Sequence, residues 1–319
     1  MAVLKLKPSY KDYLWGGDRL KNKYNKQYDG DVLAESWELS CHMDGESLIE
    51  GGEFSGKSLR EYIDWEGKRV LGKNCMQFQD FPVLIKFIDA KQDLSIQVHP
   101  SDQYALEKEG QFGKTEMWYI VECEEGACLY YGFSRKISRE ELRQRIQDET
   151  ILEVLNRIPV QKGDVFFIEA GTVHAIGKGI VIAEIQQNSN VTYRVYDYGR
   201  VGADGKKRDL HIEKALEVAN RDPKVRSKSF EPHLGRCRYF SVDKLVLDGK
   251  MLQKIEGVID GESFLHLLIL DGEGCVCSEN RVDFKRGDSL LLTASTGTFE
   301  IQGACEALLT TIPREKQMN

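Results

Sequence analysis

The sequence lacks several features that would assign it to a protein class at once. It has only 7 prolines in 319 residues, and no apolar stretch approaches the roughly 20 residues that a membrane-spanning helix requires. Lysines interrupt the first segment, MAVLKLKPSYKDYLWGG, so it does not predict a secretory signal. An excess of basic residues is also missing, because 44 Lys and Arg stand against 51 Asp and Glu. The net charge of −7 argues against a general nucleic-acid-binding or anionic-membrane surface.

The 8 cysteines follow no metal-binding or disulfide pattern. They are dispersed, with no C-x2-C pair, and the single close pair is Cys275 and Cys277, whose alternation is typical of a strand. An even count is compatible with disulfides, but a chain of this length does not need them for stability. We therefore expect reduced thiols and a cytoplasmic protein.

The composition is that of a globular protein, and the length suggests two domains at roughly 150 residues each. Few segments have helical patterns. The predicted helices are one from a capping box at Ser58 and Glu61 through Trp65, one over 104–109 after Ser101 and Asp102, one in two pieces from Ser138 to Pro159, and one over 212–219 capped by Asp209.

The remaining sequence consists of short β-branched or aromatic runs separated by Gly, Asp and Lys, which predict strands. Residues 163–171 also resemble residues 287–295, but the first copy continues to His174 and the second has Thr298 there. We therefore expect a mainly β protein with two related jelly-roll domains. The predicted division is a catalytic domain over 1–225, with a helical insertion at about 138–157, and a second domain over 226–319 without metal ligands.

Two of the 6 histidines lie in patterns that favour metal binding. Gln97 and His99 alternate on a predicted strand and so share one face, and Glu116 begins another strand. His174 follows a turn, where a further strand starts. Two imidazoles, a carboxylate and an amide oxygen suit Zn²⁺, with Fe²⁺, Mn²⁺ or Co²⁺ as alternatives.

The spacing Gly163-x5-Glu169-x-Gly171-x2-His174 resembles the second cupin motif, and Gln97-x-His99 with Glu116 resembles the first. More narrowly, LSIQVHPSD, GKTEMWY, GTVHAI and EIQQNSNVTYRVYDYGR are similar to type I mannose-6-phosphate isomerases of the short bacterial class. The resemblance implies a two-domain cupin fold and the reversible conversion of mannose 6-phosphate to fructose 6-phosphate. It also implies one zinc ion per chain, bound by Gln97, His99, Glu116 and His174.

Such an isomerisation moves a proton between C1 and C2 through an enediol. We expect Glu184 to transfer the proton, Arg194 to stabilise the enediolate, and Lys114 to assist ring opening or charge stabilisation. Ser95 shares the face of Gln97, and together with Lys114 and Arg200 it is predicted to bind the phosphate. Gly113 occupies the position where some family members have a histidine, so a mechanism that uses that histidine cannot operate here.

Two other functions fit the same residues. One is a different metal-dependent cupin enzyme, such as an Fe²⁺ oxygenase, although such substrates do not need three phosphate-binding groups. The other is a non-enzymatic cupin that binds sugar phosphates. In every case the expected partner is a small molecule, with neither nucleic acid nor membrane, and the protein is expected to be a monomer or a weak homodimer.

Overall fold

The computed structural model describes residues 3–202, 205–226, 228–229 and 231–314. The chain forms two compact units: unit 1 comprises residues 1–11, 18–87 and 229–319, and unit 2 comprises residues 12–17 and 88–228. This division differs from the predicted one at the N-terminal end, where 1–11 and 18–87 lie with the C-terminal segment. The reason is non-local strand pairing, because Val3 pairs with Leu292 across antiparallel strands.

Unit 1 is built around one large antiparallel sheet. Its strand order is β16-β17-β22-β19-β21-β1-β6, and β18 and β20 pair with β22 and β19. The bounds are β1 Val3–Lys7, β6 Leu48–Glu50, β16 His233–Arg236, β17 Ser241–Asp248, β18 Lys254–Ile259, β19 Leu265–Cys277, β20 Arg281–Lys285, β21 Ser289–Leu292 and β22 Gly297–Thr311. Smaller strands of this unit are β2 Ser9–Lys11, β3 Glu35–Leu39, β4 Cys41–His42 and β5 Gly45–Glu46.

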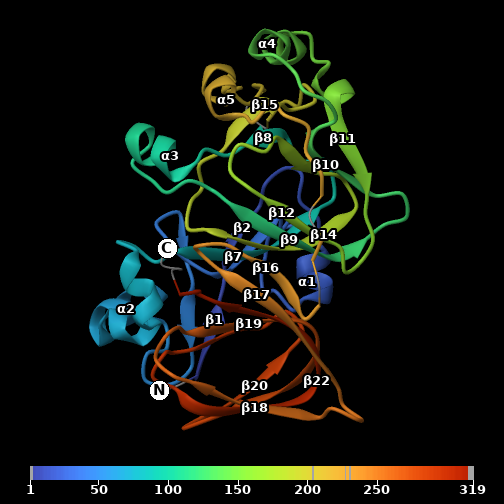
Figure 1. Ribbon diagram of the computed structural model, residues 1–319. Helices are drawn as coiled ribbons and strands as arrows, with labels where there is room; N and C mark the ends of the chain where they lie inside the picture. Colours follow the sequence, from blue (N-terminus) through green and yellow to red (C-terminus); the bar gives the residue numbers. More distant parts are fainter. Residues whose placement is uncertain (1–2, 203–204, 227, 230, 315–319) are drawn as a thin grey trace. The chain divides into compact units, whose positions relative to one another are not determined.

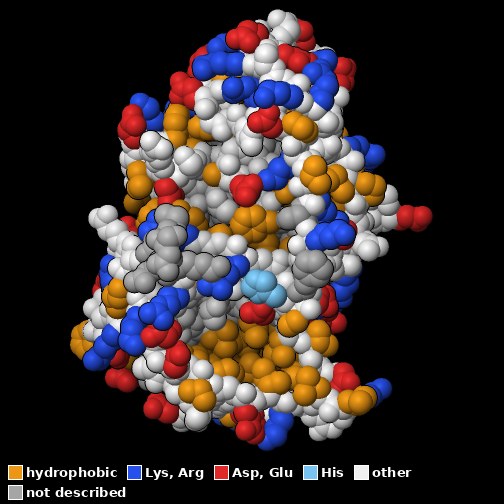
Figure 2. Space-filling view, viewed as in Figure 1, with side chains coloured by type: hydrophobic (Ala, Val, Ile, Leu, Met, Phe, Trp, Pro, Cys, Tyr) orange, Lys and Arg blue, Asp and Glu red, His pale blue; other side chains and the backbone are white. Residues whose placement is uncertain are grey.

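The sheet buries an apolar cluster, which includes Leu267, Ile269, Phe284 and Ile301. Hydrophobic side chains also gather on the face of unit 1 that Figure 2 shows, over β17, β19 and β22 of Figure 1. The long strands β19 and β22 are each continuous, although glycines divide each of them into two apolar runs in the sequence. Gly272 and Gly303 occur inside these strands with positive φ, so they bend the strands without ending them.

The helices of unit 1 are short: α1 Arg19–Lys23, α2 Leu59–Glu66, and the 3₁₀ turns η1 Lys68–Leu71 and η2 Lys73–Gln77. The capping box predicted for α2 is confirmed. The Ser58 side chain accepts a hydrogen bond from the Glu61 backbone N–H, and the Glu61 carboxylate accepts one from the Ser58 N–H. β7, Val83–Ala90, carries the chain from unit 1 into unit 2.

Unit 2 contains two groups of antiparallel strands, visible in its upper and lower halves in Figure 1. One group has the order β11-β10-β13-β8-β15, and in the other β12, β9 and β14 are neighbours. The bounds are β8 Ile96–Val98, β9 Glu116–Cys123, β10 Cys128–Phe133, β11 Leu155–Pro159, β12 Val165–Ile168, β13 His174–Ile176, β14 Ile180–Gln187 and β15 Tyr193–Tyr196.

The described residues of unit 2 also form three helices and a 3₁₀ turn: α3 Asp102–Lys108, α4 Arg139–Gln147, η3 Ile151–Val154 and α5 Ile212–Val218. Helices α4 and α5 contact each other, and α5 lies on β15 (Figure 1). The prediction that the insertion is helical up to Pro159 is wrong, because 155–159 pair with β10 as a strand. His211, rather than Asp209, lies at the N-terminus of α5.

The predicted fold class, a mainly β chain with a few inserted helices, is confirmed. None of the described helices is long and apolar enough to span a membrane. All 8 cysteines are free thiols. In Figure 2, Lys and Arg side chains alternate with Asp and Glu over unit 2, so the visible face carries no continuous surface of one sign.

Candidate metal and substrate site

The register of the strands in unit 2 places three predicted site residues in one row. Across β13 and β8, His174 pairs with Gln97, and across β8 and β15, Gln97 pairs with Arg194. Directly opposite residues of antiparallel strands project to the same face, so the three side chains lie side by side. Alternation along β8 then adds Ser95 and His99 to that face.

The second group of strands supplies the acidic residues. Glu184 of β14 pairs with Trp118 of β9, and Gln186 pairs with Glu116. Glu116 and Trp118 are two residues apart and therefore project from the same face of β9. All three residues Glu116, Trp118 and Glu184 are buried, with at most 3% of their surface exposed.

His99, Glu116 and His174 converge, with one ligand atom from each lying within 4.8 Å of the others. The Nδ1 of His99 lies 2.8 Å from the carbonyl oxygen of Val191, and the Nδ1 of His174 lies 2.8 Å from that of Thr172. Because each Nδ1–H donates to a carbonyl, each Nε2 carries the lone pair. The His174 Nε2 is 3.2 Å, and the His99 Nε2 3.6 Å, from a Glu116 carboxylate oxygen. Two fixed imidazole lone pairs and a carboxylate form a donor set that fits a divalent metal ion.

Burial of the whole side chain lowers the pKa of His174 to about 4, and the positive charge of Lys114 adds to this effect. A neutral imidazole at physiological pH is the form that binds a metal ion. The lowered pKa of His174 and the hydrogen bond of its Nδ1 to Thr172 therefore both indicate a neutral imidazole whose Nε2 can bind a metal ion.

Gln97 can complete the donor set. Its Nε2 lies 3.4 Å from the His174 Nε2. A half-turn of the amide would exchange this nitrogen for Oε1, the atom of a glutamine that ligates cations. His174 and Glu116 would then share a metal ion with the amide oxygen.

Lys114 lies among the same groups. Its ammonium donates to Glu116 Oε2 at 2.6 Å and to the His99 Nε2 at 3.2 Å, and it is 3.6 Å from Glu184 Oε1. The side chain is almost entirely buried, so this charge acts at short range and in a poorly solvated environment. Glu184 is oriented from its other side by Trp118, whose Nε1 donates to Glu184 Oε2 at 2.8 Å.

Arg194 contacts Ser95, because its Nε donates to the serine Oγ at 3.3 Å. One of its terminal nitrogens donates to the carbonyl oxygen of Asp209 at 3.0 Å. Partial burial lowers the pKa of Arg194, and the positive charges of Arg208 and Arg200 contribute to the shift. Such a cluster of like charges is an environment in which an anion is stabilised.

Arg200 belongs to a cluster with Asp197 and Arg208. It donates to Asp197 and to the Asp93 carbonyl oxygen, and Arg208 donates to both Asp197 oxygens at 2.9 and 2.7 Å. Burial alone would raise the pKa of Asp197, but the hydrogen bonds from the two arginines lower it below its normal value. The three residues predicted to bind phosphate are therefore divided: Ser95 lies with Arg194, Arg200 with Asp197, and Lys114 with the metal ligands.

Sequence reasoning missed two contributors to this site. Trp118 is not among the predicted site residues, and only the register with Glu184 reveals its hydrogen bond. Arg208 follows Arg200 in the basic segment GRVGADGKKRD, and that local excess of positive charge was the signal that could have pointed to it.

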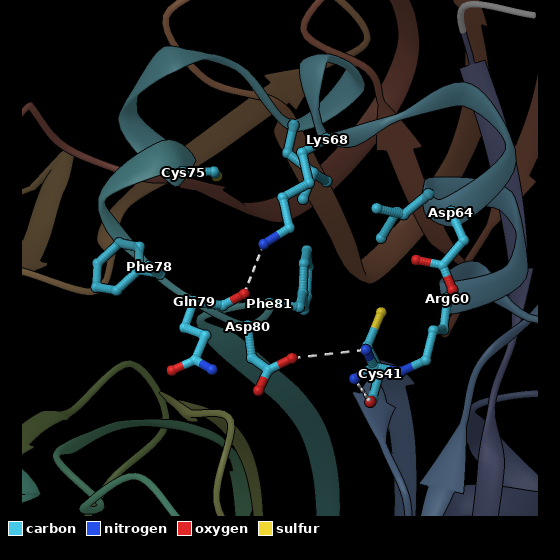
Figure 3. A pocket seen from close by; sticks show the side chains of 11 residues that line it. Cys41, Arg60, Asp64, Lys68, Cys75, Phe78, Gln79, Asp80 and Phe81 are labelled. Atoms are coloured by element: carbon cyan, nitrogen blue, oxygen red, sulfur yellow. Dashed lines mark hydrogen bonds and ion pairs between the residues drawn. The ribbon is translucent and has the colours of Figure 1, made fainter.

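A cavity in unit 1 is excluded as the substrate site by its size. It is lined by residues that include Cys41, Arg60, Lys68, Cys75 and Asp80, which Figure 3 shows around it. Its volume of about 40 Å³ can hold only a few water molecules. Burial raises the pKa of Cys75 to about 12 and also that of Cys41, so neither thiol ionises at neutral pH.

Two family profiles match the chain. The profile described as "Phosphomannose isomerase type I, catalytic domain" matches residues 3–126, and "Mannose-6-phosphate isomerase, cupin domain" matches residues 232–312. Mannose-6-phosphate isomerase ManA of Bacillus subtilis (strain 168) is 38% identical over 315 residues, which cover 95% of this chain and 96% of the relative.

Solved structures agree in fold. The crystal structure of mannose 6-phosphate isomerase from Bacillus subtilis superposes with a TM-score of 0.87 at 34% identity, covering 97% of this chain and 99% of that one. A mannose 6-phosphate isomerase bound with zinc and yttrium has a TM-score of 0.78 at 19% identity, covering 99% of this chain and 100% of the other. At that identity the second likeness concerns the fold alone.

Proposed function

Because this chain belongs to the type I phosphomannose isomerase family, it catalyses the reversible isomerisation of mannose 6-phosphate to fructose 6-phosphate, and we propose that it does so with one zinc ion. The family therefore favours an isomerase over the two alternatives, which were an iron oxygenase and a non-enzymatic cupin that binds sugar phosphates. The proposed zinc ligands are an amide, two imidazoles and a carboxylate, from Gln97, His99, His174 and Glu116.

The observation that carries this proposal is the convergence of His99, His174 and Glu116 with both Nε2 lone pairs directed at the cluster. Zinc is preferred over Fe²⁺, Mn²⁺ or Co²⁺ because nitrogen ligands with few carboxylates suit it, and a structural neighbour is described as bound with zinc. No other group of three His, Cys, Asp or Glu ligands converges in the described part of the chain. We infer one ion per chain and catalysis by residues of the predicted domain 1–225, with no metal ligand contributed by 226–319.

When bound, the metal ion polarises the substrate oxygens next to the reacting carbons. Glu184 is proposed to carry the proton between C1 and C2. The Trp118 indole holds one of its carboxylate oxygens, which leaves the other oxygen on the side of Lys114. Lys114 would assist ring opening and stabilise negative charge on the enediolate. In deuterated water, product that contains solvent deuterium at C1 or C2 would support this proton transfer, whereas complete retention of the substrate hydrogen would favour a hydride shift.

The negative charges of the substrate, on the enediolate and on the phosphate, require a second group of residues that bind them. Arg194 is proposed to stabilise the enediolate, and the Ser95 hydroxyl, Lys114 and Arg200 to bind the phosphate. The grouping of Arg194, Arg200 and Arg208 near Asp197 supports a local positive region in a chain whose net charge is −7. Arg208 is an additional candidate for the phosphate group, because its side chain is 34% exposed and it donates to the same Asp197 oxygen as Arg200.

Metal content with activity tests the proposed ligand set. The variant His99→Ala should lose bound zinc and turnover together, as measured by elemental analysis and a coupled assay with mannose 6-phosphate. His233→Ala is the matched control, because that histidine is exposed in unit 1 and should keep both. Full activity of His99→Ala after chelation and zinc restoration would refute the ligand set.

Cellular location and assembly are also proposals. Eight free thiols support a reducing compartment, and hence the cytoplasm. We propose a monomer or a weak homodimer, which sedimentation at several protein concentrations would test.

A further inference from the structure

Two thiols of unit 1 contact each other. Cys275 and Cys277 lie on β19, and their Sγ atoms are 3.8 Å apart. Val276 between them is fully buried in the apolar core, so alternation along the strand directs both thiols to the outer face of the sheet. Among the cysteines, all of which lie in the described part of the chain, theirs is the one pair with sulfurs in hydrogen-bonding contact.

The two thiols differ in access. Cys275 is 3% exposed, whereas Cys277 is partly exposed at the end of β19, next to the turn into β20. Burial, together with the hydrogen bond and the charge of Cys277, raises the pKa of the Cys275 thiol. Cys277 pairs in register with Arg281 and Cys275 with Asp283, and the Arg281 guanidinium donates to the Asp283 carboxylate at 3.0 Å. Cys277 is therefore the thiol that a solvent reagent reaches first, and Cys275 is the thiol held behind it.

The other six cysteines lack this combination. Cys41, Cys75 and Cys305 are buried, and burial raises the pKa of Cys237 to about 11. Cys123 donates its thiol hydrogen to the carbonyl oxygen of Val160. Cys128 is partly exposed, but it has no second sulfur in hydrogen-bonding contact among the described residues. A reagent that oxidises thiols in pairs should therefore act selectively at Cys275 and Cys277.

We propose that Cys275 and Cys277 form a modification site at which a low-molecular-weight disulfide, RSSR, oxidises the two thiols to an intramolecular disulfide. The Cys277 thiolate attacks one sulfur of RSSR, which forms a Cys277–SR bond and releases one RSH after protonation. The Cys275 thiolate then attacks the Cys277 sulfur, which forms the Cys275–Cys277 bond and releases the second RSH. In total, two protein thiols lose two electrons and two protons, and RSSR gains both.

The resulting disulfide is readily reversible for a geometric reason. Two residues apart on an extended strand, the Cα atoms are separated by about 6.6–6.8 Å. That separation is at the upper end of the range that a disulfide spans, so closing the ring strains the strand. The position of Cys277 as the last residue of β19 limits the disturbance to the strand end, and a strained disulfide is easily reduced again.

A single tryptic peptide allows a direct test. Residues 255–281 contain both cysteines and no other, and residues 287–314 contain only Cys305. The intact, zinc-loaded protein is incubated with oxidised glutathione, alkylated with iodoacetamide, digested and analysed by mass spectrometry. We expect peptide 255–281 to take up neither glutathione nor alkyl groups and to be two hydrogen atoms lighter. Dithiothreitol should restore two alkylation sites, and the Cys305 peptide, as internal control, should not change.

The variants separate the two steps. Cys275→Ser should retain glutathione on Cys277, because the resolving thiol is gone, and Cys277→Ser should be modified at least about tenfold more slowly at Cys275. Three results would overturn the proposal: wild-type peptide still alkylated at both positions, a stable glutathione adduct in the wild type, or a disulfide to another cysteine. The measurement on the wild type needs no variant and does not depend on the zinc site of unit 2.

Discussion

The neutral imidazole of His266 should make unit 1 sensitive to mild acid. This residue is completely buried on β19, and its Nε2 lies 2.8 Å from Ser289 Oγ. Because the Ser289 hydroxyl donates to the carbonyl oxygen of Glu38, the imidazole Nε2 must donate to Ser289. Its Nδ1 has no hydrogen-bond partner among the described residues. A proton at Nδ1 would therefore create a buried, unpaired charge, and burial lowers the pKa of His266 to about 3.

The sign and size of the effect follow from this pKa. Above the unfolded pKa of about 6.5, His266 is neutral in both the folded and unfolded states and does not change the free energy of unfolding. Between about pH 6.5 and 3 only the unfolded state binds a proton, so the stability falls as the pH falls. At pH 5 this one group should lower the free energy of unfolding by about 2 kcal/mol relative to pH 7.5.

The assay compares wild type with His266→Gln, whose side chain keeps a donor to Ser289 but does not titrate. Urea unfolding is followed by circular dichroism at pH 7.5, 6 and 5, with a chelator in every sample so that metal binding makes no contribution. The stability advantage of wild type over His266→Gln should shrink by about 2 kcal/mol between pH 7.5 and 5. Thr310→Val, which changes the residue paired with His266 but keeps the imidazole, should retain the wild-type pH dependence. If the difference in free energy of unfolding between wild type and His266→Gln did not vary with pH, the reasoning would be refuted.

Three further predictions concern unit 2. Glu184→Gln should lower kcat by roughly 10²–10⁴ with little change in KM, measured by a coupled steady-state assay, and a kcat within twofold of wild type would exclude Glu184 as the proton carrier. Trp118→Phe removes the hydrogen bond to Glu184 Oε2, so kcat should fall by roughly tenfold while zinc content stays constant; loss of zinc instead would contradict a role through Glu184. Gly171→Ala should destabilise the protein by about 1–2 kcal/mol or more, seen as a lower Tm, because φ at this residue is +88° and a Cβ would lie 2.9 Å from the Val218 carbonyl oxygen. An unchanged Tm would show that the turn before His174 tolerates a side chain.

Local sequence patterns were sufficient to predict the strands and helix ends that depend mainly on residues close together in the chain. Short runs of β-branched and aromatic residues predicted strands, and β7, β9, β10 and β14 form from such runs; the capping box at Ser58 predicted the start of α2. β7 and β14 are buried along their whole length, as continuous apolar runs predict, whereas α2 buries one face and caps its own N-terminus. The same patterns failed for 155–159, where apolar residues continue a helical spacing but pair with β10 as a strand. There, hydrogen bonds to a distant segment outweighed the local preference.

The sequence by itself also determined the chemistry of the site. Motif spacing and the resemblance to type I isomerases selected Gln97, His99, Glu116, His174, Glu184 and Arg194, and the structure brings these residues together within unit 2. Residue type sets what a side chain can donate, accept or ligate, and this information is present in the chain without any fold.

Only the tertiary structure decided which of these groups touch. The contacts of Trp118 with Glu184 and of Arg208 with Asp197, and the packing of residues 18–87 with the C-terminal strands, all join segments far apart in the chain. Each depends on strand register or loop position, which results from the burial of the whole core and not from the residues nearby. For that reason the sequence selected the candidate ligands and charged groups, whereas their hydrogen-bond partners and the low pKa of His174 emerged only from the folded chain.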